Sequence, residues 1–182
     1  MSELRTKLNT VDYSGDRKKS EVVTSIQEAI DATGYTTVEL NDEKPWGAYF
    51  RLDSRQADNF VKDFFPEINA TEARRGNADA ELSPKFLLVS PGHRLSWQYH
   101  NRRAERWVFL TRGGYNKSLS DDPGEMVNVT PNMVVQFEKG ERHRLVGLTE
   151  EYILVAEIWQ HVDASNTSDE DDIVRLADDY ER

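Results

Sequence analysis

The second half of the chain contains four side chains that can bind a divalent metal ion and whose spacing would let them meet at one site. Gln98 and His100 are separated by one residue, Glu105 comes five positions after His100, and His143 ends a later Gly-Glu-Arg-His string. Because side chains alternate between the two faces of a β-strand, Gln98 and His100 can point into one cavity from a single strand. An amide oxygen, two imidazoles and a carboxylate suit a borderline divalent cation. The pattern therefore predicts a metal site.

The elements that position these ligands follow from their spacing. We expect Glu105 to return on the neighbouring strand after a turn at residues 101–104, while His143 arrives from a more distant hairpin. The alternative is that His100 and His143 are ordinary core or surface histidines. The chain has four histidines in all, and two of them stand at ligand spacing beside Glu105, which favours the metal site.

The composition limits the fold and the kinds of partner. At 182 residues the chain is long enough for one domain with a sizeable core and an attached arm. A formal net charge of -10 argues against nucleic acid or an anionic membrane as partner, although a local arginine cluster can still bind a small anion. The absence of cysteine excludes disulfides and thiolate chemistry. With no secretion signal and no apolar stretch of membrane-spanning length, we expect a cytoplasmic protein.

The first part of the chain predicts helical and irregular segments. Residues 1–19 are polar and predict a loosely ordered arm. Apolar residues at helical spacing predict one helix over 20–33 and a second over 54–65, where an aromatic stripe indicates core packing. Residues 67–82 have the composition of an irregular insertion.

The rest of the chain changes to short β-rich runs separated by turns. This pattern predicts an antiparallel β-barrel over residues 84–160, with both helices packed outside it. The expected strands cover residues 86–90, 107–111, 126–129, 133–137, 144–148 and 152–159. In the acidic tail over 163–182, Ser168 and Asp171 form a capping-box pattern, which predicts the start of a helix ahead of Ile173.

Three strings resemble one family of the cupin superfamily, the type II mannose-6-phosphate isomerases. They are Lys44-Pro45-Trp46-Gly47, the segment from Pro91 to Trp107, and the acidic segment from Glu170 to Arg182. The resemblance implies a mainly β fold, the double-stranded β-helix or jelly-roll barrel of cupins, with an α-helical N-terminal extension. We expect residues 1–43 to form an arm and helix, and residues 44–182 to form the cupin domain with a C-terminal lid segment. The resemblance is to the stand-alone form, without the guanylyltransferase part.

The resemblance also implies an activity, the metal-dependent aldose–ketose isomerisation of mannose 6-phosphate to fructose 6-phosphate. Zinc is the metal most in keeping with the predicted ligands, and manganese, cobalt, nickel, iron and magnesium are alternatives. The implied partner is a small phosphosugar, and the implied assembly is a homodimer, as in many cupins. A non-catalytic cupin module that binds a sugar phosphate or a metal is the alternative. A metal oxygenase is disfavoured because a glutamine ligand serves oxygen activation poorly.

Isomerisation needs an electrophile on the carbonyl oxygen, a base near the carbon and an anchor for the phosphate. Since guanidinium groups pair bidentately with phosphate, the predicted substrate-binding residues are Arg103, Arg106, Arg175 and Arg182. The predicted catalytic residues are Arg103, Glu105, Lys85 and His161. The base itself stays open between His161, Glu157 and a metal-bound water. A simpler interpretation of Arg175 and Arg182 is that they are solvated charges paired with nearby aspartates.

Four departures from the family pattern bear on the substrate. Arg106 stands where the family has a histidine, Glu138 replaces a proline, and Lys44 replaces an arginine. His161 replaces a glycine, and the loop over 162–168 that follows it is longer than in the family. The change at Arg106 either removes an acid–base group or adds a phosphate contact, and together the four leave room for a loss of catalysis.

Overall fold

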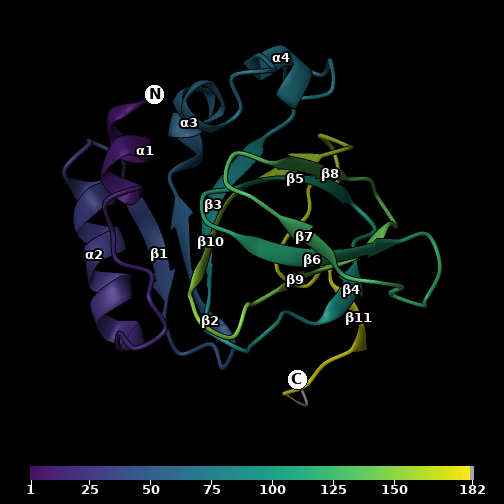
Figure 1. The fold of residues 1–182 in the computed structure, drawn as a ribbon. Helices are drawn as coiled ribbons and strands as arrows, with labels where there is room; N and C mark the ends of the chain where they lie inside the picture. The colour runs from purple at the N-terminus through teal and green to yellow at the C-terminus, as the bar shows by residue number, and fades with distance from the viewer. Residues whose placement is uncertain (181–182) are drawn as a thin grey trace.

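Two antiparallel β-sheets face each other in the computed structural model, which describes residues 1–180 (Figure 1). The six-stranded sheet contains, in spatial order, β1 (Thr37–Asn41), β2 (Gly47–Leu52), β3 (Leu82–Val89), β10 (Ile153–His161), β5 (Arg103–Phe109) and β8 (Val134–Phe137). The five-stranded sheet contains β11 (Val174–Ala177), β4 (Trp97–Tyr99), β9 (Arg142–Val146), β6 (Gly113–Ser118) and β7 (Val127–Val129). The prediction of a mainly β, antiparallel fold is confirmed.

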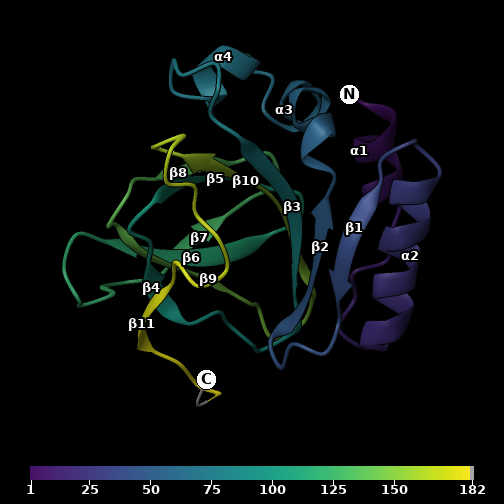
Figure 2. The same cartoon turned by 180° about the vertical axis from the view of Figure 1, so that it is seen from behind.

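The main helices lie outside this pair of sheets, against the outer face of the six-stranded one (Figures 1 and 2). The helices of the described chain are α1 (Glu3–Leu8), α2 (Lys19–Asp31), α3 (Ala57–Phe64) and the short α4 (Ala70–Ala73). The helix predicted over 20–33 corresponds to α2, and the one predicted over 54–65 corresponds to α3 with the 3₁₀ turn that precedes it, Ser54–Gln56. α2 packs inward through residues that recur every four positions, Val22, Ile26 and Ile30.

Alternation along the strands separates two apolar cores. In β10, Ala156 and Ile158 belong to the core beneath the helices, whereas Ile153 and Val155 belong to the core between the two sheets. All nine residues of β10 are buried, because helices cover one face of the strand and the second sheet covers the other. The polar residues described below lie on the face that points between the sheets.

Two segments differ from the sequence prediction. Residues 1–19 are not a loosely ordered arm, because Leu4 and Leu8 of α1 stand four positions apart on one helix face and are only 1% and 0% exposed. The capping-box pattern at Ser168 and Asp171 does not start a helix. The chain that follows it instead forms β11, which pairs with β4 at the edge of the five-stranded sheet.

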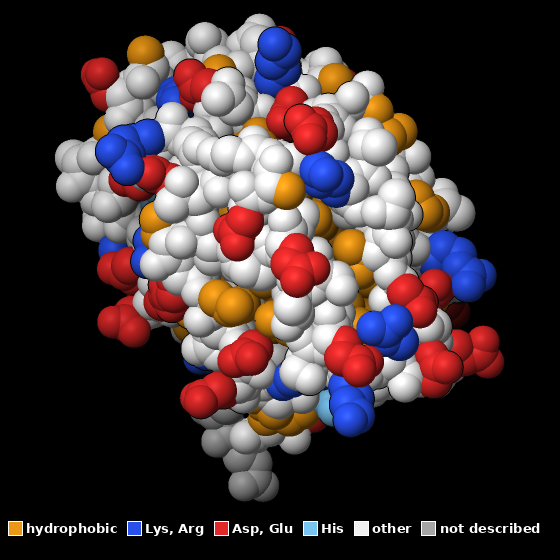
Figure 3. Space-filling model, turned by 90° about the vertical axis from the view of Figure 1, so that its left-hand side faces the viewer, with side chains coloured by type: hydrophobic (Ala, Val, Ile, Leu, Met, Phe, Trp, Pro, Cys, Tyr) orange, Lys and Arg blue, Asp and Glu red, His pale blue; other side chains and the backbone are white. Residues whose placement is uncertain are grey.

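The surface on the side of α1 and α2 is mixed in character. Figure 3 shows acidic and basic side chains interspersed there with smaller apolar areas. The formal net charge of -10 is therefore not gathered into one acidic patch on this face. None of the helices within residues 1–180 combines the length and the apolar composition needed to cross a membrane.

Candidate metal centre

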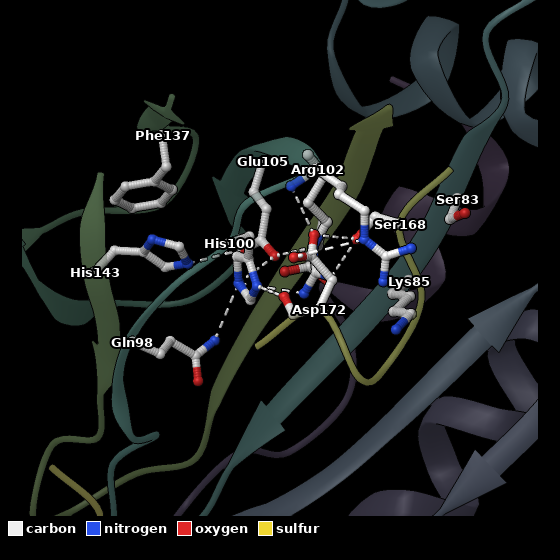
Figure 4. A network of polar contacts seen from close by, with 12 residues as sticks. Ser83, Lys85, Gln98, His100, Arg102, Glu105, Phe137, His143, Ser168 and Asp172 are labelled. Atoms are coloured by element: carbon white, nitrogen blue, oxygen red, sulfur yellow. Dashed lines mark hydrogen bonds and ion pairs between the residues drawn. The ribbon is translucent and has the colours of Figure 1, made fainter. Parts of the chain in front are cut away.

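The four predicted metal ligands lie together at a buried point between the two sheets (Figure 4). Nε2 of His100 lies 3.1 Å from one carboxylate oxygen of Glu105, and Nε2 of His143 lies 3.1 Å from the other. The candidate ligand atoms of these three residues are all within 4.8 Å of one another. The amide nitrogen of Gln98 lies 3.4 Å from Nε2 of His100. All four residues are buried, with at most 7% of their surface exposed.

Strand pairing explains how the ligands meet. Gln98 of β4 stands opposite His143 of β9 within the five-stranded sheet, and His100 follows directly after β4. Glu105 projects from β5, which belongs to the facing sheet. The sequence analysis predicts the reverse, with Glu105 on the strand next to Gln98 and His143 more distant. That prediction is wrong because the short turn between Tyr99, the end of β4, and Arg103, the start of β5, carries the chain across to the other sheet.

Each imidazole is held in the orientation that a metal ligand needs. Nδ1 of His143 lies 2.9 Å from the backbone carbonyl oxygen of Glu141, and Nδ1 of His100 hydrogen-bonds the backbone carbonyl of Asp172. A carbonyl oxygen only accepts, so each Nδ1 carries the proton. Both Nε2 atoms are then left with a lone pair on the side of Glu105, as in metal sites where a backbone carbonyl fixes the tautomer.

The spacing of these atoms is close to that around a bound cation. Tetrahedral nitrogen and oxygen ligands about 2.0–2.2 Å from a zinc-like ion lie roughly 3.3–3.6 Å from one another, slightly farther apart than the two 3.1 Å separations around Glu105. Gln98 completes the set when its amide is turned by 180°, so that its oxygen is directed toward His100. At present this oxygen accepts a hydrogen bond from Ser96 at 2.6 Å. The Ser96 hydroxyl can donate or accept, so the turn preserves the contact.

Arg103 brings a positive charge to the centre. Its Nε donates to Glu105 at 2.8 Å, and its Nη2 lies 3.2 Å from Nε2 of His100. Burial raises the pKa of Glu105, but the charge of Arg103, together with the two imidazoles whenever they are protonated, outweighs burial and holds it well below its usual range. Burial lowers the pKa of His100, and Glu105 only partly opposes this. The centre thus offers an ionised carboxylate and a neutral imidazole, the states in which these groups bind metal.

The centre opens into a cavity that encloses about 590 Å³ of free space, part of it continuous with solvent. The cations that line the cavity are Lys44, Lys85, Arg103 and Arg175, and the lining acids are Glu105, Glu157 and Glu170. Within residues 1–180 neither Lys44 nor Arg175 forms an ion pair, so no described carboxylate competes with an anionic ligand for these two charges.

The chain from residue 167 to residue 173, here called the lid segment, lies against this cavity and contributes two of its lining residues, Glu170 and Ile173. Glu170 contacts Lys85, with 2.5 Å between carboxylate oxygen and Nζ. Arg103 donates to the hydroxyl of Ser168 at 2.8 Å and to the backbone carbonyl of the next residue at 3.0 Å. The lid segment is therefore bound both to a cation of the cavity and to the arginine of the metal centre.

Arg106, predicted to contact substrate, lies away from the cavity. It follows Glu105 on β5 and therefore points from the opposite face of the strand. Its guanidinium group lies 2.8 Å from the carboxylate of Glu67 and 3.1 Å from the amide oxygen of Gln136. The alternation along β5 that directs Arg103 and Glu105 into the site is the reason why Arg106 is excluded from it.

His161, a further predicted site residue, does not line the cavity. The ring nitrogens of His161 face the hydroxyl of Ser83 at 3.3 Å and the backbone N–H of Ser168 at 2.9 Å. Burial lowers the pKa of His161. Arg182 lies outside the described residues.

Glu157 and Trp159, both on β10, form part of the cavity wall. Nε1 of Trp107 donates to the carboxylate of Glu157 at 2.8 Å. Burial, reinforced by the charge of Glu105, raises the pKa of Glu157 to about 8. Sequence reasoning names Glu157 but misses Trp159. The available signal is strand alternation, which places Trp159 on the same face as Glu157.

A family model described as mannose-6-phosphate isomerase C-terminal matches residues 77–178, more than half of the chain. The chain belongs to this family. The matched segment of this isomerase-family domain contains all four candidate metal ligands together with the lid segment. Two proteins named Xanthan biosynthesis protein XanB, from Xanthomonas campestris pv. campestris strains B100 and ATCC 33913, are 29% and 28% identical to it over 170 residues. These 170 residues are 92% of this chain but 30% of each relative, so the chain spans less than a third of their length.

Solved structures resemble this family member in fold. Vicilin from Corylus avellana (hazelnut) matches with a TM-score of 0.50 at 12% identity, covering 76% of this chain and 34% of vicilin. A cupin 2 conserved barrel domain protein from Salinispora arenicola CNS-205 matches with a TM-score of 0.46 at 19% identity, covering 69% of this chain and 84% of that one. The family match and the two facing sheets confirm the cupin fold that the sequence resemblance implies.

Proposed function

We propose that this domain is a metal-dependent aldose–ketose isomerase of sugar phosphates, with mannose 6-phosphate and fructose 6-phosphate as its substrate and product. One observation carries the proposal: a single cavity joins a buried set of metal-ligating side chains to several cations. A chain with a net charge of -10 repels a phosphate dianion overall, so a local positive site is required to bind it. The family relationship supports the same activity.

Lys44, Lys85 and Arg175 are the phosphate anchors in this proposal. All three line the cavity, and the first and last form no ion pair with a described residue. Lys85 contacts Glu170, whose side chain is 60% exposed, so a phosphate group can take its place. Arg103 instead donates to Glu105 and to the lid segment, and its role is to position the metal-binding carboxylate. Arg106 has no part in the proposal.

Isomerisation moves a proton between two adjacent carbons through an enediolate. A divalent cation held by Gln98, His100, Glu105 and His143 would supply the electrophile that polarises the reacting oxygens. Glu157 is the base of the proposal, because it lines the cavity and its pKa of about 8 gives it the proton affinity to accept and return a proton near neutral pH. The hydrogen bond from Trp107 holds its carboxylate in position.

The test is an assay of the purified protein for bound metal and for conversion of mannose 6-phosphate to fructose 6-phosphate. We expect turnover that a chelator abolishes and that zinc, or another of the candidate divalent ions, restores. The variant Glu157→Gln should keep the metal and lose turnover, which separates the base from the ligands. If no candidate ion gives turnover, the proposal is wrong.

A non-catalytic module that binds a sugar phosphate is the second candidate. It is favoured by the contacts of the lid segment with Lys85 and Arg103, which engage two cavity cations with protein acceptors. In that case mannose 6-phosphate should bind in a calorimetric titration without being converted. The homodimer implied by the resemblance stays a prediction, which light scattering on the purified protein would check.

A further inference from the structure

Trp159 lies in the middle of the cavity wall and carries an unused hydrogen-bond donor. It belongs to β10, which is paired with β3 on one side and with β5 on the other. The residue lines the cavity and is only 6% exposed. Its Nε1 is buried and has no hydrogen-bond partner among residues 1–180. Buried N–H groups in native proteins are almost always paired with protein, water or ligand, so this donor in a cavity-lining residue is available for an acceptor that the chain itself does not provide.

Two cations flank the indole ring of Trp159. Nζ of Lys85, on β3, lies 3.3 Å from the ring centroid, and Cζ of Arg103, on β5, lies 3.5 Å from it. Since β3 and β5 lie on opposite sides of β10, the two cations approach the ring from opposite sides. The faces of an aromatic ring are electrostatically negative and attract cations at such distances. The ring therefore separates two like charges, and its faces are not available for stacking on a sugar.

The edge of the ring has the opposite character. It is electrostatically positive and bears the N–H group, so it attracts anions and acceptors. A phosphate oxygen at this edge would accept from Nε1 while remaining in the field of Lys85 on one side and Arg103 on the other. A neutral hydroxyl at the same point would gain the hydrogen bond but little from the two charges. The arrangement favours a phosphorylated over an unphosphorylated sugar.

We propose that Trp159 is a specificity-determining residue of the phosphate subsite, donating through Nε1 to a phosphate oxygen and holding Lys85 and Arg103 apart on either side of it. The inference deepens the proposed function and rests on it for the identity of the sugar. The anion subsite itself can be tested with inorganic phosphate, which needs neither turnover nor a sugar.

Two substitutions distinguish the hydrogen-bond donor of Trp159 from the ring that keeps Lys85 and Arg103 apart. Trp159→Phe keeps an aromatic ring between the cations and removes the N–H group. We expect it to weaken phosphate binding about tenfold, as for the loss of one hydrogen bond to a charged acceptor. Trp159→Leu removes the ring as well and should weaken binding further. With mannose 6-phosphate as substrate, KM should rise in Trp159→Phe while kcat changes little, because the phosphate group does not react.

Trp97→Phe is the matched control. Trp97 is 2% exposed and donates through Nε1 to the backbone carbonyl of Asp121 at 2.8 Å, and it is not among the residues that line the cavity. Its substitution removes a buried indole N–H of the same kind outside the proposed subsite. Phosphate affinity should stay within about twofold of the wild type.

A direct readout is the indole N–H resonance in nitrogen-15-labelled wild-type protein titrated with inorganic phosphate. The chain has four tryptophans, and the Trp159→Phe and Trp97→Phe spectra identify two of the four signals. We expect phosphate to shift the Trp159 signal more than the Trp97 signal. An unshifted Trp159 signal at saturation, phosphate affinity in Trp159→Phe equal to the wild type, or no phosphate binding at all would each overturn the inference.

The inference and the proposed function can fail separately. If phosphate shifts the Trp159 signal but mannose 6-phosphate is never converted, the anion subsite stands and the isomerase is rejected. If mannose 6-phosphate is converted while Trp159→Phe keeps the phosphate affinity and KM of the wild type, the isomerase stands and the role of Trp159 is rejected. Should Trp159→Leu not fold, the Trp159→Phe titration and the wild-type spectra still decide the question.

Discussion

The backbone carbonyl of Asp172 accepts a hydrogen bond from Nδ1 of His100, although the two residues are 72 positions apart in the chain. The carboxylate of Asp172 in turn accepts the backbone N–H groups of Asn101 and Arg102, each at 2.9 Å. One residue of the lid segment therefore holds the turn after β4 and also orients an imidazole of the metal centre. The lid segment at the cavity and the metal centre are thus linked through one residue, Asp172.

Substituting Asp172 should weaken metal binding even though its side chain is not a ligand. Asp172→Ala removes the acceptor for the two N–H groups and frees the carbonyl that orients His100. Loss of such a contact typically lowers metal affinity about 10- to 100-fold. Competition with a chelator of known affinity measures the change, and Asp171→Ala, at an exposed neighbour in the same segment, is the control. Equal affinities in both variants would show that the orientation of His100 does not depend on Asp172.

Replacing the ligand histidines should remove the metal altogether. His100→Ala and His143→Ala each delete one of four donors from a buried site, and three donors leave the affinity too low for metal to persist through dialysis. Elemental analysis of the dialysed variants checks this. His93→Ala is the matched control, because the His93 side chain is exposed and its contacts, a hydrogen bond to the backbone carbonyl of Pro91 and stacking on Tyr180, include none of the metal ligands. Unchanged metal content in both ligand variants would falsify the assignment.

The pH dependence of kcat/KM should follow the ionisation of Glu157. Its pKa in the folded protein, about 8, lies above the ordinary value of 4.5, because burial disfavours the charged form. A base acts when deprotonated, so kcat/KM should rise as the pH passes through about 8. Glu157→Gln should lower kcat by about 100- to 10,000-fold, the usual effect of losing a general base. A wild-type profile that falls between pH 7 and 9 contradicts this role.

The raised pKa of Glu157 should increase activity with pH but decrease the stability of the folded protein with pH. A carboxyl group whose pKa is raised on folding favours the folded state below its unfolded pKa, and this contribution is lost as the pH rises through the folded value. Relative to Glu157→Gln, the wild type should therefore lose stability between about pH 4.5 and pH 8. Thermal denaturation of both proteins across this range measures the difference. Parallel curves would mean that Glu157 keeps an ordinary pKa in the folded state.

Glu170→Gln should strengthen phosphate binding. The carboxylate of Glu170 contacts Lys85, which is the most buried of the proposed anchors, so it competes with a phosphate group for the same cation. Because the side chain of Glu170 is 60% exposed, the ion pair contributes about 0–1 kcal/mol, and the gain should not exceed about fivefold. Calorimetric titration with inorganic phosphate measures the affinity. The control is Asp171→Asn, which removes the same charge from a neighbouring residue. A loss of affinity would mean that Glu170 helps to form the anion site.

The ligand set can be predicted from the sequence because it depends on local rules. Alternation along a strand joins Gln98 to His100, and residue chemistry adds Glu105 and His143. The partition of the strands between two sheets depends on the whole topology, and for this reason the neighbour of Gln98 is predicted wrongly. Trp159 is missed for a different reason: alternation places it on the face of Glu157, but a tryptophan in a strand whose residues are all buried is most simply interpreted as core.

The first sheet strands are also hard to predict from the sequence. β1 alternates, but its apolar residues Val38 and Leu40 are the ones that face outward, 48% and 40% exposed at the edge of the sheet. In β2, five of six residues are buried, so it lacks the polar alternation of a half-exposed strand. The order of residues 1–19 depends on four scattered inward residues, Leu4, Leu8, Val11 and Tyr13, and on backbone contacts with residues 150–152, none of which produces a periodic signal.

Because Glu105 comes from one sheet while Gln98 and His143 come from the other, a bound ion would act as a cross-link between the two halves of the sandwich. Within residues 1–180 no strand of one sheet pairs with a strand of the other through a ladder of backbone hydrogen bonds. Metal at 100 times its dissociation constant should stabilise the fold by about 2.7 kcal/mol. Amide hydrogen exchange should then slow together in β4, β9 and β5, making backbone protection a measure of metal occupancy that is independent of any substrate.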